Sequence, residues 1–224
     1  MTVFVLKIIA CISMFLDHVK YAIPETTNYA TMYLGRIAFP IFAFLISEGY
    51  IHTSNLKKYI KRLSIFAMIS QIPFMLFRTL VGEWLMLNIM FTLLLGLCAI
   101  IFYDKIPKKY ISIPLVLLCI ILGKVLNVDY GWFGVALVFI FYLCKNKKVL
   151  LSIIYLIVIT IWFYTIKVFN LETIYVLLYF IAYIIPLVII MFYNGKQGKK
   201  IKYFLYWFYP IHMLVLYLLS LIKF

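Results

Sequence analysis

The sequence predicts an all-α integral membrane protein with about nine transmembrane helices. Apolar residues make up 67% of the chain and charged residues 12%, whereas soluble domains are roughly half apolar and about a quarter charged. The apolar residues form continuous runs rather than an alternating pattern, which favours helices over a β-barrel. At about 20 residues per span, these runs fill the 224 residues, so we interpret 1–224 as a single polytopic domain.

Nine apolar segments have lengths near that of a membrane-spanning helix. They cover residues 3–23, 33–51, 59–81, 84–103, 110–127, 130–144, 148–168, 172–193 and 202–222, and no internal repeat is evident. The first segment carries Asp17 and His18 and has no A-x-A cleavage site after it. We therefore expect it to remain as a helix rather than to be removed as a signal peptide.

The Lys and Arg residues gather in alternate breaks between the apolar segments. The breaks after the second, fourth, sixth and eighth segments hold fourteen of them: Lys57, Lys58, Lys61, Arg62, Lys105, Lys108, Lys109, Lys145, Lys147, Lys148, Lys196, Lys199, Lys200 and Lys202. The other breaks are nearly free of basic residues, with Arg78 and Lys167 near their edges. Because short Lys/Arg-rich loops stay in the cytoplasm, the N-terminus is predicted to be cytoplasmic and the C-terminus external.

The net charge of +14 is thus explained by topology, and no nucleic-acid partner is expected, because no nucleic-acid-binding motif accompanies it. The sequence contains no P-loop, G-x-S-x-G or H-E-x-x-H motif. The four cysteines, Cys11, Cys98, Cys119 and Cys144, lie within or beside apolar runs and form no C-x-x-C pair. We interpret them as packing residues and expect no metal.

Ionisable residues inside the predicted spans are the first candidates for a site. A charge at the bilayer centre costs about 2.5–3.5 kcal/mol and usually faces a partner or a water-filled cavity. Asp17 and His18 lie in the outer third of the first predicted helix, and Arg36 lies at a similar depth in the second. An Asp17–Arg36 ion pair is therefore expected, with either a structural or a functional role. The pair does not explain His18, whose neighbours favour a function.

A second polar group lies at the cytoplasmic end of the second predicted helix. Glu48 and His52 are four residues apart and share a helix face, where they form either an interfacial cap or part of a site. The following stretch NLKKYIKR contains Lys57, Lys58, Lys61 and Arg62. Such a stretch either contacts anionic lipid at the inner surface or holds the phosphates of a cytosolic cofactor.

Polar residues also occur in the later segments. His212 follows Pro210 by two residues in YWFYPIHMLVLY, and the proline predicts a kink with Tyr209 close to the imidazole ring. The kink either improves packing or builds a polar site. Asn88 in the fourth segment and Asp129 at the start of the sixth add further polar groups.

Five stretches spread along the chain follow the pattern of a known family. They are LKIIACISMFLDHVKYAI, LGRIAFPIFAFLISEGYIHTSNLKKYIKRLSIFAMISQIPF, LNIMFTLLLGL, DYGWFGV and FYPIH, and GRIAFPIFAFLISEGY is the most specific part. Together they resemble the TraX family, membrane proteins associated with the N-acetylation of conjugative pilin. The resemblance spans nearly the whole chain, although residues 145–205 contribute little to it.

The resemblance implies an acetyltransferase embedded in the bacterial cytoplasmic (inner) membrane, in contact with the lipid bilayer and using cytosolic acetyl-CoA. By position, the family's motif residues are Asp17, His18, Arg36, Glu48, His52, Asn88, Asp129 and His212. The family commonly has a small residue after the Asp-His pair, whereas Lys20 stands two positions later here. The acceptor can therefore differ from that of other members.

Acyl transfer requires a base for the nucleophile's proton and donors for the developing oxyanion. His18 and His212 are both candidates for the base. We favour His18, because Arg36 at a similar depth can polarise the thioester carbonyl. Adjacent helix residues point about 100° apart, so Asp17 can hold Arg36 and leave His18 free. The candidate catalytic residues are thus His18, Asp17, Arg36, His212 and Glu48.

The remaining candidates concern binding. Lys57, Lys58, Lys61, Arg62 and His52 are predicted to meet the CoA phosphates, while Asn88, Asp129 and Tyr209 are predicted to serve the substrate or the structure. The favoured acceptor is the N-terminal amine of a pilin or another peptide. A hydroxyl of an envelope glycan or lipid, a transporter function and a non-catalytic role in pilus assembly are the alternatives.

Overall fold

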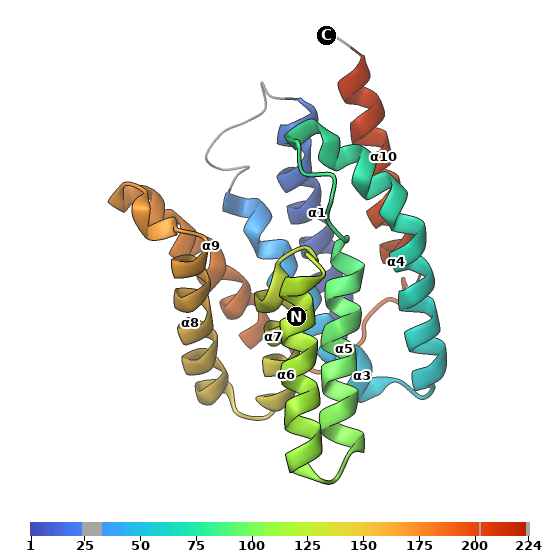
Figure 1. The fold of residues 1–224 in the computed structure, drawn as a ribbon, viewed down its shortest axis with the longest axis vertical. Helices are drawn as coiled ribbons and strands as arrows, with labels where there is room; N and C mark the ends of the chain where they lie inside the picture. Colours follow the sequence, from blue (N-terminus) through green and yellow to red (C-terminus); the bar gives the residue numbers. More distant parts are fainter. Residues whose placement is uncertain (24–32, 202, 223–224) are drawn as a thin grey trace.

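The structure, a computed structural model, describes residues 1–23, 33–201 and 203–222. Regular structure in this part of the chain is helical (Figure 1). The α-helices are α1 (Val3–Ala22), α3 (Ala38–His52), α4 (Leu56–Arg78), α5 (Ile89–Lys105), α6 (Lys109–Val125), α7 (Gly131–Leu143), α8 (Lys148–Thr165), α9 (Thr173–Met191) and α10 (Phe204–Leu221). Three 3-10 helices, η2 (Gly35–Ile37), η3 (Thr79–Val81) and η4 (Val168–Asn170), join or extend them.

Each predicted segment overlaps one of these α-helices, so the all-helical fold is confirmed. Two helices begin at asparagine caps that the hydropathy pattern does not reveal. Helix α4 begins three residues early, because the Asn55 side chain accepts a hydrogen bond from Lys58 N at 2.9 Å. Helix α5 begins at Ile89 rather than at residue 84, because the Asn88 side chain accepts one from Met90 N at 2.9 Å. Lys202, predicted to open the last helix, lies outside the described residues.

Four helical segments of the described chain are long and apolar enough to cross a membrane: Leu56–Val81, Lys148–Thr165, Thr173–Met191 and Phe204–Leu221. Helix α1 has 20 residues but carries three charged side chains, whereas α3, α5, α6 and α7 have 13 to 17 residues. The outer face of α8 exposes Val149, Ile153, Ile157 and Ile161, the spacing of a helix that faces lipid. These features indicate a membrane protein; the nine spans and the cytoplasmic N-terminus stay predictions.

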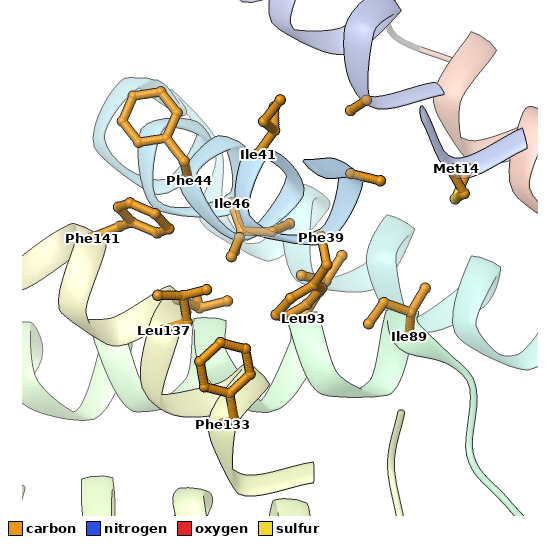
Figure 2. Close-up of a cluster of buried hydrophobic side chains, with 14 of the residues drawn as sticks. Met14, Phe39, Ile41, Phe44, Ile46, Ile89, Leu93, Phe133, Leu137 and Phe141 are labelled. Carbon is orange, nitrogen blue, oxygen red and sulfur yellow. The ribbon is translucent and has the colours of Figure 1, made fainter. Parts of the chain in front are cut away.

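Helix α3 lies at the centre of the apolar core. It packs against α1, α5 and α7, and Figure 2 shows its side chains facing those of α5 and α7. Phe44 meets Phe141 of α7 edge to face, with ring centroids 5.6 Å apart. Gly96 allows α5 and α7 to approach closely, because a Cβ at this position would overlap the side chain of Val138.

A polar contact ties α3, α5 and α7 together at one end. The hydroxyl of Tyr50 donates to Asp104 Oδ2 at 2.6 Å, and that of Tyr142 donates to Oδ1 at 2.5 Å. Both carboxylate oxygens of Asp104 are therefore engaged between helices, which gives this residue a structural role.

Helix α1 is placed between α3 and α10, since it packs against both. Figure 1 shows α10 beside α4, with α8 and α9 on the other side of the molecule. Side chains from the two ends of the chain consequently meet along α1, and they build the site described next.

Candidate functional site

A cavity of about 1060 Å³ extends along α1. Its walls include α1 residues from Val3 to Tyr21, positions about 27 Å apart along a helix that rises 1.5 Å per residue. That length is close to the ~30 Å thickness of a bilayer's hydrocarbon core. One end, here called the basic mouth, is lined by Lys7, Arg62 and Lys200. The opposite end, here called the Asp17 end, is lined by Asp17, His18, Arg36, Arg78 and Asp129.

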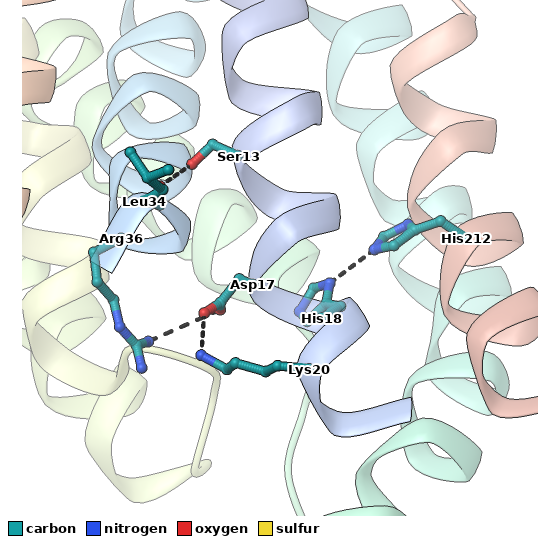
Figure 3. Close-up of polar contacts among 7 residues, drawn as sticks. All are labelled: Ser13, Asp17, His18, Lys20, Leu34, Arg36 and His212. Atoms are coloured by element: carbon teal, nitrogen blue, oxygen red, sulfur yellow. Dashed lines mark hydrogen bonds and ion pairs between the residues drawn. The ribbon is translucent and has the colours of Figure 1, made fainter. Parts of the chain in front are cut away.

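Two cations hold Asp17 (Figure 3). Lys20 Nζ lies 2.7 Å from Oδ1, and Arg36 Nη1 lies 3.9 Å from Oδ2. The predicted Asp17–Arg36 pair is thus confirmed, and Lys20 extends it to a triad. The preceding Gly35 makes this possible, because a Cβ there would overlap the Asp17 side chain. The triad fixes Arg36 at the cavity wall.

His18 points away from Asp17, towards α10 (Figure 3). Its Nδ1 lies 2.8 Å from Nε2 of His212, a residue 194 positions later in the chain. Asp17 thus leaves His18 free, as expected, but the packing of α10 on α1 brings a second imidazole onto the first, which was not predicted. His18 lines the cavity, whereas His212 is buried behind it, 5% exposed.

The hydrogen bonds around the two rings assign their protons when both are neutral. The carbonyl of Phe208 can only accept, and it lies 2.7 Å from His212 Nδ1. His212 Nδ1 therefore carries the hydrogen, and its Nε2 accepts from His18 Nδ1. In that arrangement His18 Nε2 retains a lone pair, and no described residue makes a hydrogen bond to it. His18, which lines the cavity, thus keeps a ring nitrogen that can accept a proton.

Asp129 lies in the turn between α6 and α7, where its backbone is held on both sides. Its N–H donates to Leu87 O at 2.8 Å, and its carbonyl accepts from Thr92 Oγ1 at 2.5 Å. Tyr130 follows with a φ of +62°, a left-handed conformation that is uncommon for a bulky residue and marks a strained turn.

The Asp129 carboxylate faces the cavity and forms no ion pair with a described residue. Burial raises the pKa of Asp129 to about 6, while the attraction of Arg78 acts in the opposite direction. Asp129 therefore carries a negative charge at neutral pH without a close counter-ion from the described chain.

Glu48 and His52 contact each other, with Oε2 and Nε2 3.3 Å apart. Both line the half of the cavity that leads to the basic mouth. Glu48 follows Arg36 by twelve residues, about 18 Å along the helix axis at 1.5 Å per residue. Because Arg36 lies at the Asp17 end, Glu48 is far from His18. His52 is 62% exposed, as expected for the interfacial cap.

Of the five residues predicted to meet the CoA phosphates, Arg62 and His52 line the cavity. Lys57, Lys58 and Lys61 lie on the exposed face of α4, so the structure does not bring them to the cavity. The rotation of α4 explains the difference, because Tyr59, Leu63 and Phe66 form its buried stripe. Arg62 borders that stripe.

The remaining two candidates have different surroundings. Asn88 is fully buried and does not line the cavity; its amide nitrogen donates to Ala67 O at 2.7 Å and to Gln71 Oε1 at 2.9 Å. Asn88 thus links α4 to α5 and has a structural role. Tyr209 lines the cavity, close to His212 on α10.

Four charged residues that line the cavity, Lys7, Arg78, Lys124 and Lys200, were not among the predicted site residues. Arg78 pairs with Glu83, and its charge acts on both His18 and Asp129. Lys7 and Arg78 are charges inside or at the edge of apolar segments, a signal that could have identified them. Lys200 had no comparable signal, since it lies in a break with several other lysines.

The fold and the cavity define a helical membrane protein with a buried polar site built from both ends of its chain. The chain belongs to the TraX protein family, whose model matches residues 3–220, which confirms the predicted family. It is also similar to the "Probable fimbrial assembly protein FimC, serogroup H1" of Dichelobacter nodosus. The two are 27% identical over 244 aligned residues, which cover 95% of this chain and 93% of that protein. No solved structure matches the chain.

Proposed function

We propose that this protein is a membrane-embedded acetyltransferase that moves an acetyl group from acetyl-CoA to a primary amine at the membrane. The observation that carries the proposal is the His18–His212 pair, which leaves one imidazole nitrogen of the cavity-lining His18 able to accept a proton. Membership of the TraX family, and similarity to a protein named for fimbrial assembly, support a pilin or another peptide as the acceptor.

In the proposed reaction the residues of the Asp17 end have distinct roles. The neutral amine nitrogen attacks the thioester carbonyl carbon through its lone pair, and His18 Nε2 removes a proton from this nitrogen as the C–N bond forms. Arg36 stabilises the oxyanion; its Nε is buried and has no hydrogen-bond partner in the described chain. The C–S bond breaks, and His18 returns its proton to the CoA thiolate. An acceptor that arrives as an ammonium ion releases its other proton to solvent.

An amine acceptor is favoured over a hydroxyl by Asp129. A carboxylate without a close counter-ion, in a confined cavity, attracts an ammonium group strongly. Its charge also acts on Asp17 and Tyr209, which places it at the same end of the cavity as the histidine pair. Asp129 would therefore bind the acceptor before the proton leaves it.

The direct test uses the purified protein, acetyl-CoA and two peptides that lack Lys, Ser and Thr. The peptides are identical except that one has a free N-terminus and the other a blocked one. We expect acetylation of the free peptide, with release of CoA thiol, and none of the blocked peptide. Acetylation of glycan or lipid hydroxyls instead would identify an O-acyltransferase, and solute flux through liposomes without acetyl-CoA binding would identify a transporter.

Asp129→Asn is expected to raise KM for the amine acceptor about 10- to 100-fold, with KM for acetyl-CoA unchanged.

The wild type should bind an N-trimethylated peptide less well as the pH falls through about 6, because Asp129 then becomes neutral while the ligand keeps its charge. The groups that also face Asp129 are Arg78, Arg36, Asp17 and Tyr209. Calorimetry between pH 5 and pH 8 measures this dependence, and an equal pH response in Asp129→Asn would contradict the assignment.

A further inference from the structure

We propose that Lys7, Arg62 and Lys200 bind the phosphate groups of the acetyl donor at the basic mouth. This inference rests on the proposed function and specifies where that function takes its donor. The three side chains come from α1, α4 and the segment between α9 and α10, and all of them line the cavity.

Arg62 is the most firmly placed of the three. Its guanidinium lies over two aromatic rings, 5.7 Å from the ring centroid of Tyr59 and 5.5 Å from that of Tyr206. Its Nε is buried and has no hydrogen-bond partner in the described chain. A buried donor without a partner costs free energy, and a phosphate oxygen at the mouth would satisfy it. The planar fork of arginine suits such an oxygen geometry.

Lys200 is held at the mouth by the backbone of the segment that carries it. Val3 N donates to Lys196 O at 2.9 Å, and Phe4 N donates to Gln197 O at 3.1 Å. These bonds fasten residues 196–197 to the beginning of α1 and bring Lys200 to the mouth with Lys7. They also occupy the first two backbone donors of α1, so side chains rather than the helix terminus must bind the anion.

The three basic side chains at the mouth are not held in ion pairs by the described chain. None of its ion pairs includes Lys7, Arg62 or Lys200. Lys7 and Arg62 are close enough for their charges to repel. Three like charges around one opening attract a polyanion, and the diphosphate and ribose phosphate of CoA are such a group.

The distance between the two ends of the cavity suits this donor. Lys7 and His18 are about 16 Å apart along α1 at 1.5 Å per residue. The pantetheine arm, a chain of about eleven atoms between the diphosphate and the sulfur, spans ~14 Å if it extends like a backbone at about 3.5 Å per three bonds. A donor with its phosphates at the mouth can thus present its acetyl group to His18.

The experiment compares acetyl-CoA with S-acetylpantetheine, which has the same thioester but no phosphate. Arg62→Ala and Lys200→Ala are each expected to weaken CoA binding at least tenfold, measured by calorimetry, and to impair acetyl transfer to the free-amine peptide much more with acetyl-CoA than with S-acetylpantetheine. Lys200 lies outside the helices, so its variant tests the site even if Arg62→Ala folds poorly. Lys57→Ala and Lys61→Ala are the matched controls, because they remove equal charges from the exposed face of the same helix.

Equal losses of CoA binding in Lys61→Ala and Arg62→Ala would overturn the assignment and indicate a diffuse charge effect. Displacement of bound CoA by phosphatidylglycerol vesicles, but not by inorganic pyrophosphate, would also overturn it and assign the mouth to lipid headgroups. Acetyl transfer from acetyl-CoA with unaltered CoA binding in the Arg62 and Lys200 variants would reject this site while the proposed function stands. A wild-type protein that binds no acetyl-CoA would instead reject the proposed function.

Discussion

Replacing His18 with alanine is expected to lower kcat for acetyl transfer by about 10²- to 10⁴-fold, the range that a general base contributes. The change removes the imidazole from the cavity wall, so the amine proton has no acceptor at the reacting centre. Release of CoA thiol measures the rate, and CoA binding at the basic mouth, measured in parallel, should be unchanged.

Phe15→Ala is the matched control for His18→Ala, because Phe15 lies on the same helix and is exposed outside the cavity.

His212→Gln is expected to lower kcat by a smaller factor than His18→Ala and to move the pH midpoint of kcat, because His18 loses the ring nitrogen that orients its proton. Both KM values should be unchanged. Wild-type kcat in His18→Ala would show that another group is the base.

Replacing Asp17 with alanine is expected to lower the free energy of unfolding by about 3–5 kcal/mol, the usual cost of removing one partner from a buried ion pair. The side chains of Lys20 and Arg36 are 6% and 24% exposed, and both would lose the carboxylate that they share. Denaturant unfolding in detergent, followed by tryptophan fluorescence, measures the change.

The contrast is Glu83→Ala, which removes the carboxylate partner of Arg78. Glu83 is 60% exposed, so the loss should stay within about 1 kcal/mol. Asp17→Asn keeps the shape of the side chain and separates the loss of charge from the loss of volume. If Asp17→Ala proved no less stable than Glu83→Ala, the triad would not be a source of stability.

The order of the helices follows from the sequence because membrane-spanning length and apolar character are local properties. Nine apolar segments predicted the nine α-helices of the described chain, and errors were confined to their ends. The ends of α4 and α5 depend on single hydrogen bonds from the side chains of Asn55 and Asn88, which a hydropathy pattern does not report. The Asp17–Arg36 pair was also predictable, because a charge in an apolar segment requires a neighbour at its own depth.

The site itself depends on which helices are neighbours and on how each is rotated about its axis. The sequence predicted His18 and His212 in two separate helices. Only the packing of α10 on α1 brings their rings together, although they are 194 positions apart in the chain. Likewise, four basic residues at the start of α4 are equivalent by sequence. The rotation that buries Tyr59 leaves Lys57, Lys58 and Lys61 exposed and directs Arg62 to the cavity, where Lys7 and Lys200 join it. Rotation and neighbourhood arise from the packing of the whole chain, so no local pattern of residues encodes them.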